Sequence, residues 1–536
     1  MTELPSPAQT SASPVTRLPG LRLAILAGLL LWLAFPPVGL WPLAWVALAP
    51  LACSVARSRR MRQAMWRGYL FGWAFLGITW YWTGLTIVAW THSQIGWLAW
   101  FGLTMLMALY YAAWAGAAWF ICQRTTGFRR VLTLAASWAA LEWIRTLGSL
   151  TMPWAQLGYS QYRFLPAIQI ADLVGTPGVS FVVSLVAFAL FEWRYTNRSE
   201  ASKKVLKLSS GIAGVVLLYG ILRLAQPEAG PQIVAATMQP NFRVYRDNAS
   251  PQQDLYTITG LTERAATGSH SPISLWVWPE SASPLDAMYD YRAISSLSGL
   301  IQKYGGALVT GSRVVDPVKR FEYNSSVLIS PHAPPQRYDK QHLVPFGEFI
   351  PYRNILPPWL DAMFQFPQSD VVAGEAGRTL SYRLPGGPIT ILGPFICYES
   401  MYPGIARDLS RSGANLLVTQ SNDDWTQSLG AMQQHVAGVV LRAVENRRNV
   451  VRSTQTGISC ILDSRGRILA EVGAGDAGYA IHRCTLISGT TLYARLGDWF
   501  ALVCLIFTLR QLWTRRSSKS PRRDATTGDL DEASTG

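Results

Sequence analysis

The chain has 536 residues, of which 49% are hydrophobic and only 15% are charged, whereas an ordinary soluble domain carries about 25% charged residues. This composition argues against a purely soluble protein. The formal net charge of +15 does not require a nucleic-acid partner, because the basic residues lie mainly in short loops and tails. We therefore expect an integral membrane protein that also carries a soluble part, and no binding of nucleic acid.

Eight apolar stretches are predicted to be membrane helices, since about 20 apolar residues cross the hydrocarbon core of a bilayer. Pro36 and Pro37 form the turn between the first two stretches. A cleaved signal peptide is the alternative for the first stretch, but the double proline and a second apolar run stand where the small residues of a cleavage site belong. The predicted spans are Leu21–Phe35, Leu40–Val55, Tyr69–Trp90, Ile95–Cys122, Val131–Leu147, Gly178–Trp193, Leu208–Leu224 and Leu492–Trp513.

Lys and Arg residues gather in every second connection, after the second, fourth, sixth and eighth spans. Cytoplasmic loops carry such an excess of basic residues, so these loops and both termini are predicted to be cytoplasmic. The soluble region then lies on the periplasmic side of the inner membrane. The expected organisation is a disordered tail at 1–20, seven spans within 21–225, a soluble catalytic domain at 226–489, a last span at 490–514 and a disordered tail at 515–536.

Short runs rich in β-branched residues alternate with helical stretches between residues 226 and 489. Such alternation predicts a layered α/β domain. The predicted strands are Ile233–Met238, Ile273–Trp278, Ala307–Val314, Ser325–Ile329, Ile389–Ile396, Asn415–Gln420, Val450–Thr454 and Ile458–Leu462, and the predicted helices are Asp254–Ala266, Arg292–Lys303, Pro403–Arg411 and Gly430–Asn446.

Three residues whose side chains could take part in catalysis follow strand ends: Glu280, Lys340 and Cys397. A carboxylate can take the proton of a thiol, and an ammonium group can stabilise both the thiolate and the oxyanion that forms when sulfur attacks a carbonyl. Each signal is weak alone, because a buried Cys is usually a small core residue and a lone Glu or Lys usually a surface charge. No Cys-x-x-Cys or His-x-x-x-His pair predicts a metal site, and we expect no cofactor.

The soluble region holds three cysteines, Cys397, Cys460 and Cys484. Outside the cytoplasm an odd number leaves at least one thiol free, or paired between chains. Whether Cys460 and Cys484 pair stays open at this point.

Several strings of the sequence resemble those of the carbon–nitrogen hydrolase (nitrilase) superfamily, whose members use a Glu-Lys-Cys triad. Together with the membrane layout they resemble one family of that superfamily, the apolipoprotein N-acyltransferases. The similarity covers nearly the whole chain except the tails. The strings are Ala34-Phe35-Pro36-Pro37, Glu142-Trp143-Ile144-Arg145, Pro153-Trp154, Gln239-Pro240-Asn241, Trp278-Pro279-Glu280, Asp339-Lys340, Pro345-Phe346-Gly347-Glu348-Phe349, Cys397-Tyr398-Glu399 and Ser421-Asn422-Asp423-Asp424-Trp425.

The resemblance implies a polytopic α-helical membrane domain plus an αββα sandwich outside the membrane. It also implies two-step acyl transfer, the last step of bacterial lipoprotein maturation, with Glu280 as general base, Lys340 as oxyanion stabiliser and Cys397 as nucleophile. A phospholipid would be the acyl donor, and the α-amino group of a diacylated lipoprotein the acceptor. Glu348, Tyr398 and Glu399 match family positions that hold the triad or gate the pocket. We expect a monomer.

Three features stay open on the sequence. The proline-rich stretch Phe349–Phe366, with Trp359 and Phe364, is predicted to dip into the lipid surface, although ordinary core is the alternative. Glu142 and Arg145 lie one helical turn apart, either buried as structural support or placed at the headgroups. The loop Phe242–Asn248 carries Tyr245 where some family members carry a Trp, so a role of that Trp in lipid access does not transfer to this chain.

Two rival functions use the same features. A membrane-anchored amidase or nitrilase-type hydrolase would use the same triad with water as the acceptor. A transporter with an appended domain is the second rival, but the predicted spans lack paired broken helices and carry few ionisable residues.

Overall fold

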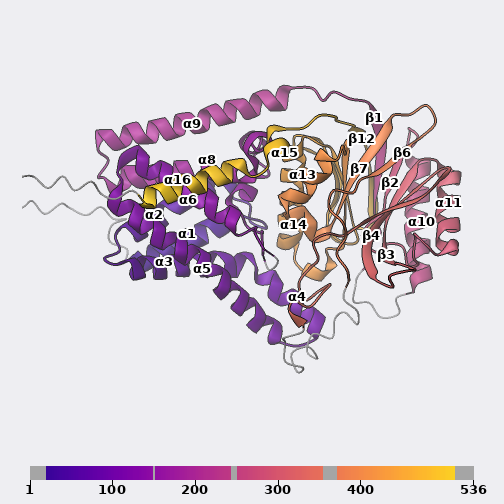
Figure 1. Ribbon diagram of the computed structural model, residues 1–536, viewed down its shortest axis with the longest axis horizontal. Coiled ribbons are helices and arrows are strands. Elements are labelled where there is room, and N and C mark those ends of the chain that lie inside the picture. The colour runs from indigo at the N-terminus through magenta and orange to yellow at the C-terminus, as the bar shows by residue number, and fades with distance from the viewer. Residues whose placement is uncertain (1–19, 149–150, 243–249, 354–370, 514–536) are drawn as a thin grey trace, which may run out of the picture.

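A computed structural model describes residues 20–148, 151–242, 250–353 and 371–513, and Figure 1 shows two parts joined end to end: a helical bundle and a two-sheet sandwich. Both predicted tails, Tyr245, and the residues of the predicted lipid-dipping stretch from 354 onward lie outside the described residues. The prediction of a helical membrane domain followed by a layered α/β domain is confirmed.

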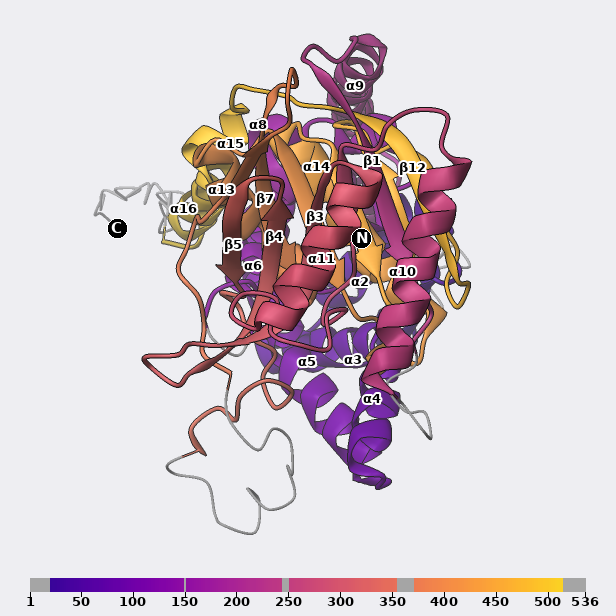
Figure 2. The same ribbon diagram turned by 90° about the vertical axis from the view of Figure 1, so that its right-hand side faces the viewer.

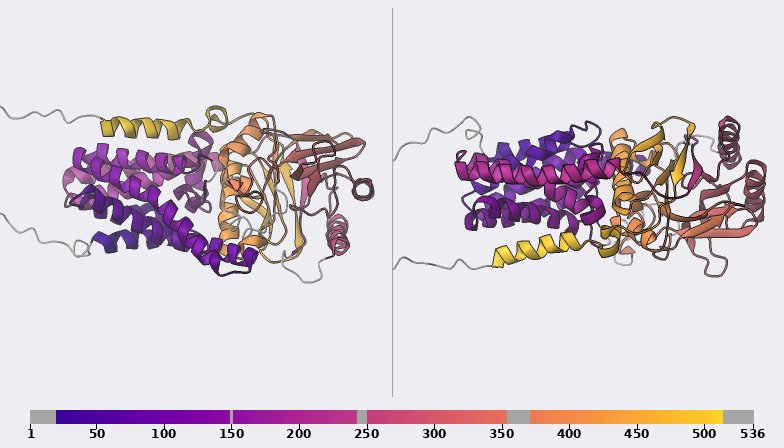
Figure 3. Two further views of the ribbon diagram at one scale, coloured as in Figure 1. Left: turned by 60° about the horizontal axis from the view of Figure 1, so that its bottom comes forward. Right: turned by 90° about the horizontal axis from the view of Figure 1, so that it is seen from above.

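The bundle consists of long helices that run along one another (Figures 1 and 3). By length and hydropathy, α5, α8 and α9 can each cross a membrane, and α1, α16 and the segment Trp41–Ala56 are shorter apolar helices. The count of eight spans stays a prediction. The bundle helices are α1 (Gly20–Leu33), α2 (Ala44–Ala56), α3 (Met61–Thr79), α5 (Ile95–Arg124), α6 (Gly127–Ile144), α8 (Ala171–Tyr195), α9 (Glu200–Ala225) and α16 (Trp499–Trp513).

Two predicted spans are broken helices in the structure. The third breaks at Trp80, and the following helix α4 (Tyr81–Thr91) leaves the bundle and reaches the sandwich. The last breaks at Gly497, which has a φ of +66°, between the short helix α15 (Leu492–Leu496) and α16. Glycine adopts this left-handed conformation without the steric cost of a Cβ, so the chain can turn from the sandwich into the bundle at this point.

Basic residues from several connections meet at the end of the bundle that lies farthest from the sheets (Figure 1). Arg67 donates to the Ser58 hydroxyl at 3.0 Å, joining the start of α3 to the end of α2. Arg124 donates to the Leu512 carbonyl at 3.3 Å, and Arg130 pairs with Glu192 at 2.9 Å. The basic connections therefore share one end of the molecule, opposite the sandwich.

The sandwich consists of two six-stranded sheets, each with three parallel strands in the middle and antiparallel strands outside. The first sheet has the order β12-β1-β2-β3-β4-β5 and the second β11-β10-β9-β8-β7-β6. The strands are β1 (Gln232–Gln239), β2 (Leu275–Val277), β3 (Ala307–Val315), β4 (Glu322–Ser330), β5 (Ala333–Asp339), β6 (Leu380–Arg383), β7 (Ile389–Ile396), β8 (Leu416–Ser421), β9 (Val450–Thr454), β10 (Ser459–Leu462), β11 (Ile468–Val472) and β12 (Gly478–Thr485).

One pair of helices covers each outer face of the sandwich (Figures 1 and 2). The helices α10 (Pro251–Gly268) and α11 (Tyr291–Tyr304) cover the first sheet, and α13 (Pro403–Arg411) and α14 (Leu429–Asn446) cover the second. In α11 only Ala293, Leu297 and Ile301 are buried, a single apolar face. Nearly all of α14 is buried, because this helix lies between its sheet and the bundle. The predicted αββα sandwich is thus confirmed.

Buried charges fasten the sandwich to the bundle. Asp172 at the start of α8 accepts from Arg447 at 2.8 Å, from Arg223 at 2.9 Å and from the Tyr219 hydroxyl at 2.8 Å. Arg447 follows the last residue of α14 and has the left-handed conformation. Its guanidinium therefore links the end of a sandwich helix to the bundle. Removing one partner of such a buried pair costs several kcal/mol, about 3–5, so the two parts should hold a defined relative position.

Candidate active site

Cys397 is the first residue of a short 3-10 helix, Cys397–Met401, which follows β7 directly. Its φ of +53° is unusual for a residue with a side chain, and such strain persists only where the surroundings hold it. His435 Nε2 donates to the Cys397 carbonyl at 2.8 Å, and Glu399 Oε2 accepts from the Ile396 amide at 2.6 Å. The sharp turn at the end of β7 is therefore fixed on both sides of the thiol.

The thiol of Cys397 is protonated at rest. Burial, followed by the Glu280 carboxylate, raises its pKa, the Lys340 ammonium lowers it, and the resulting pKa is about 12. The thiol therefore lies within electrostatic reach of Glu280 and Lys340, so the structure brings all three sequence-predicted residues together. Because the thiolate is disfavoured, sulfur needs a base at the moment of attack.

Glu280 follows β2 and is held at both carboxylate oxygens. Its Oε2 accepts from the Asn422 amide at 2.8 Å. Its Oε1 accepts from Asn324 Nδ2 at 2.8 Å and lies 3.5 Å from Lys340 Nζ. Its backbone carbonyl accepts from Gln455 Nε2 at 2.9 Å. A carboxylate fixed in this way cannot rotate away from the thiol.

Lys340 follows β5 and is buried between two carboxylates. Its Nζ lies 2.9 Å from Glu348 Oε1 and 3.5 Å from Glu280 Oε1. Burial lowers the pKa of this ammonium, but the Glu348 and Glu280 carboxylates outweigh burial and raise the pKa above its usual range. Glu348 also accepts from Asn324 Nδ2 and from the Val344 amide, each at 2.8 Å. Lys340 is thus a permanently charged group, and Glu348 holds it.

Glu399 and Tyr398 contact the surroundings of the triad. Buried Glu399 accepts from the amides of Gln341 at 2.6 Å and His342 at 3.1 Å, and from the Tyr338 hydroxyl at 2.9 Å. It therefore ties the turn at Cys397 to the segment on either side of Lys340. The Tyr398 hydroxyl donates to the Thr151 carbonyl at 2.8 Å, in the connection between α6 and α8. Glu399 fixes the triad internally, and Tyr398 fixes it to the bundle.

A second charged cluster lies behind Cys397, and the sequence patterns did not predict it. Asp423 Oδ1 lies 2.9 Å from His435 Nδ1, and Asp423 Oδ2 accepts from Arg452 Nη2 at 2.5 Å. All three side chains are fully buried. Burial raises the pKa of Asp423, but Arg452 and His435 hold it well below the usual range. Asp423 stood in a family-like string, whereas nothing distinguished His435 from its neighbours on α14.

Asn324 is the other residue that sequence patterns missed. It lies on β4 and bridges Glu280 and Glu348 with one amide nitrogen. An asparagine inside a β-strand carries no local signal of function. Only the antiparallel pairing of β4 with β5 places it beside Lys340.

Tryptophans surround the second cluster. Trp154 lies 5.4 Å from the His435 ring, and Trp82 on α4 lies 5.2 Å from Trp154 and 5.5 Å from Trp425, measured between ring centroids. A Cβ added to Gly347 would lie 3.0 Å from the Trp90 ring, so the loop after Lys340 also packs on α4. Trp82 and Trp154 are buried, so these rings are packing that joins α4 and the connection after α6 to the second cluster.

Glu142 and Arg145 are buried and hydrogen-bonded, as expected of structural residues. Glu142 Oε1 accepts from the Leu157 amide at 2.7 Å. Arg145 donates to the Tyr111 hydroxyl at 2.8 Å and to the Trp154 carbonyl at 2.9 Å. Together they hold the connection that carries Trp154 to His435.

The cysteines of the chain, all of which lie in the described residues, are free. Cys460 on β10 and Cys484 on β12 are both buried and do not pair. Cys397 is thus the soluble-region thiol that lies beside a base and a cation.

Two family models match the chain. The model described as "Apolipoprotein N-acyltransferase N-terminal domain" matches residues 27–189, and the model described as "Carbon-nitrogen hydrolase" matches residues 234–491. A protein of Geobacter metallireducens named apolipoprotein N-acyltransferase is 34% identical over 90% of this chain and 92% of its own length. One of Azotobacter vinelandii with the same name is 31% identical over 95% of this chain and 98% of its own.

Two solved structures match about half of this chain. A Saccharomyces cerevisiae member of branch 10 of that superfamily is 20% identical and matches 48% of this chain and 90% of its own, with a TM-score of 0.37. An amidase from Nesterenkonia sp. is 21% identical and matches 51% of this chain and 96% of its own, with a TM-score of 0.36.

Proposed function

Because the chain belongs to the apolipoprotein N-acyltransferase family, we propose that Glu280, Lys340 and Cys397 carry out its acyl transfer in two steps through a thioester on Cys397. The chain is an acyltransferase of lipoprotein maturation. The acyl donor in this proposal is a membrane phospholipid, and the acceptor is the α-amino group of a lipoprotein's S-diacylglyceryl-cysteine. All three triad residues come from one chain, so a monomer suffices.

In the first step, Glu280 takes the proton of the Cys397 thiol while sulfur attacks the ester carbonyl of the phospholipid. The local charge does not change, because the negative charge passes from Glu280 to the forming oxyanion, where Lys340 stabilises it. The oxyanion then collapses, so that the C=O double bond re-forms and the ester C–O bond breaks, leaving the acyl group on sulfur. Glu280 returns its proton to the leaving oxygen, and lysophospholipid departs.

In the second step, the neutral amine of the acceptor attacks the thioester carbonyl. Glu280 takes a proton from the amine nitrogen, and Lys340 stabilises the second oxyanion. The C–S bond breaks, sulfur regains a proton from Glu280, and the product amide leaves. The same base thus serves both halves, which suits two bulky substrates that occupy one site in turn.

We propose that the sandwich lies outside the cytoplasm, on the periplasmic side of the inner membrane. The basic connections at the opposite end of the bundle support this orientation. An embedded enzyme also gains proximity to two substrates that both sit in the bilayer. A reporter active only outside the cytoplasm, fused within the sandwich at residue 319, should be active. The same reporter fused after Arg523 should be silent, and the reverse pattern would overturn the orientation.

The observation that carries the mechanism is the buried thiol beside Glu280 and Lys340. The test uses the purified full chain with phospholipid carrying a labelled acyl group. Without acceptor, label should accumulate on Cys397 in a form that hydroxylamine releases. A diacylated lipopeptide with a free amine should then discharge it as amide. Release of free fatty acid with no amide would identify a hydrolase instead, and a requirement for both lipids before any labelling would exclude the two-step scheme.

A further inference from the structure

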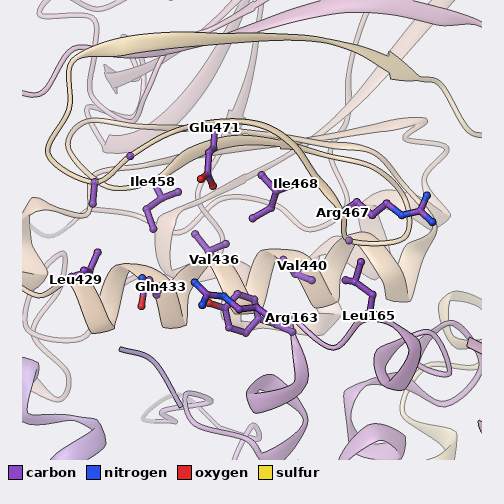
Figure 4. Close-up of a pocket in the computed structure, with 14 residues that line it drawn as sticks. Arg163, Leu165, Leu429, Gln433, Val436, Val440, Ile458, Arg467, Ile468 and Glu471 are labelled. Carbon is purple, nitrogen blue, oxygen red and sulfur yellow. The ribbon is translucent and has the colours of Figure 1, made fainter. Parts of the chain in front are cut away.

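A cavity of about 500 Å³ opens between α14, β11 and the connection that follows α6 (Figure 4). Cavities of this size are typical of small-molecule and cofactor sites. Leu429, Gln433, Val436 and Val440 of α14 form one wall, and the hairpin of β10 and β11 forms another. The third wall comes from the bundle, through the segment of Arg163 and Leu165.

Opposite charges face this cavity without pairing. Figure 4 shows Glu471 directed from β11 toward the cavity and the Arg163 side chain lying along α14 beside Gln433. Neither side chain has an ion-pair partner among the residues that the structure describes. Arg467, the other cation of the lining, already pairs with Asp463 at 3.5 Å and donates to the Leu224 carbonyl at 2.8 Å. Arg163 lies over the Tyr162 ring, 5.4 Å from its centroid. The cavity therefore offers one cation and one anion on separate walls, neither of them in an ion pair with a described residue.

The cavity opens at the end of the bundle where lipid headgroups should lie. Arg163 Nη1 is 3.9 Å from the position of a Cβ on Gly39, in the turn between α1 and α2. The neighbouring Phe164 ring stacks on Trp41 with 4.1 Å between centroids. Val38 and Leu40 in the same turn are exposed, as are Leu429 and Ile468 in the lining. Exposed apolar side chains and a Trp at this depth are typical of a bilayer interface.

We propose that this cavity binds the headgroup of a zwitterionic phospholipid as a second lipid site. Arg163 binds the phosphate, because a guanidinium can donate two parallel hydrogen bonds to phosphate oxygens, and the Gln433 amide adds a donor. Glu471 accepts from the lipid ammonium group. The acyl chains pass over Val38 and Leu40 into the bilayer. A lipid with a glycerol headgroup has no ammonium for Glu471 and fits less well.

The site is distinct from the thiol, although one helix serves both. His435 and Gly438 of α14 face Cys397 and Met401. Gln433, Val436 and Val440 lie on a neighbouring face of the same helix and line the cavity. Lipid bound here therefore contacts the helix that holds the Cys397 carbonyl without reaching the sulfur. The inference goes beyond the acyl transfer proposed above.

The test measures lipid retention by the full-length chain in detergent, by native mass spectrometry. Cys397→Ala is used as the background, so that no lipid is consumed and the result does not depend on catalysis. Dioleoylphosphatidylethanolamine is titrated against the protein and compared with dioleoylphosphatidylglycerol. The double variant Arg163→Gln, Glu471→Gln should bind the ethanolamine lipid at least about tenfold more weakly at one site. Arg163→Lys should keep part of the affinity.

The matched control is Arg292→Gln with Glu263→Gln, which also removes one cation and one anion, both exposed on the outer helices α10 and α11. It should leave retention unchanged. Equal retention by the cavity variant and the control would overturn the site. Equal binding of the glycerol lipid would overturn the choice of a zwitterion. Displacement of the bound lipid by equimolar water-soluble phosphoethanolamine would show a site for a free metabolite rather than a lipid.

Discussion

Two buried charge clusters flank Cys397, and they differ in which atoms of that residue they reach. On the side of the first sheet, Glu280, Lys340 and Glu348 form a chain of contacts at 2.9 and 3.5 Å, within electrostatic reach of the sulfur. On the side of the second sheet and α14, Asp423, His435 and Arg452 form contacts at 2.9 and 2.5 Å. That cluster hydrogen-bonds the Cys397 carbonyl, and its Asp423 carboxylate raises the pKa of the thiol less than Glu280 does.

The charge balance of the two clusters also differs. The first has two carboxylates for one ammonium; burial and then the Glu280 carboxylate raise the pKa of the thiol, so it stays protonated until Glu280 accepts the proton. The second has one carboxylate for a guanidinium and a histidine, so Asp423 is the sole anion that supports both neighbours. We infer that the first cluster carries the chemistry and that the second holds the strained turn in place.

The largest expected effect on activity comes from removing Glu280, the general base of the first cluster. Glu280→Gln should lower acyl loading of Cys397 by about 10²–10⁴-fold, because no group then takes the thiol proton. Cys397→Ser should abolish turnover, since an alcohol at this site is far harder to ionise than a thiol. Hydroxylamine-sensitive label on the full chain is the measurement. The exposed Glu375 provides the control Glu375→Gln, which should load normally, and normal loading of Glu280→Gln would remove Glu280 from the mechanism.

Breaking the second cluster should instead cost stability. Asp423→Asn leaves the buried Arg452 guanidinium without its carboxylate, and we expect a loss of about 3–5 kcal/mol in the free energy of unfolding. Glu348→Gln should lower the free energy of unfolding by less, because the Lys340 ammonium still has the Glu280 carboxylate as a partner. Thermal unfolding of the purified chain compares the two variants. Glu200→Gln, at an exposed pair with Lys203, should leave the stability nearly unchanged, because solvent screens such a pair. If Asp423→Asn is no less stable than Glu348→Gln, the assigned difference between the clusters is wrong.

His435 tests whether the second cluster acts through the turn. His435→Leu should lower kcat by up to about 10²-fold with KM for phospholipid unchanged, because the Cys397 carbonyl loses its donor and the sulfur shifts. His435→Gln keeps an amide donor and should recover part of kcat. A residue that only fills space would show the opposite order, since a buried amide without partners costs more than a buried leucine.

The smallest expected effect is on the thiol itself. Glu280→Gln removes a charge that raises the Cys397 pKa, while Lys340 remains and lowers it. The pKa should therefore fall below about 12, although acyl loading is slowed. The pH dependence of alkylation by a small neutral reagent reports the thiolate fraction. A midpoint that rises in Glu280→Gln would show that Glu280 does not act on the thiol electrostatically at rest.

Local sequence patterns were sufficient to predict the strands and helices in which buried residues recur at the period of that strand or helix. All eight predicted strands overlap observed ones, and the four predicted sandwich helices overlap α10, α11, α13 and α14. The four strands that were not predicted, β5, β6, β11 and β12, are the four edges of the two sheets. An edge strand pairs on one side and tolerates polar residues and proline, as Pro334 and Pro335 in β5 illustrate, so its sequence carries little periodic signal.

The candidate site divides in the same way. Glu280 and Cys397 could be chosen in advance, because each follows a predicted strand inside a family-like string, and Lys340 could be chosen from its string, although the strand before it, β5, was not predicted. Asn324 and His435 could not, because each lies in the interior of a regular element whose pattern it does not disturb. The helix breaks at Trp80 and Gly497 were also not predicted, because the hydropathy of an apolar stretch is the same whether its helix is continuous or broken.

The sequence by itself determined the two-part architecture, the central strands and the triad, because these follow from hydropathy, periodicity and short motifs within one element. Tertiary structure alone decided which groups support the triad. The Asn422 amide reaches Glu280 across 142 residues of chain, and the Thr151 carbonyl reaches Tyr398 across 247. Contacts at such separations depend on how the sheets and the bundle pack, and each backbone group that makes them is common to every residue type, so no local pattern records them.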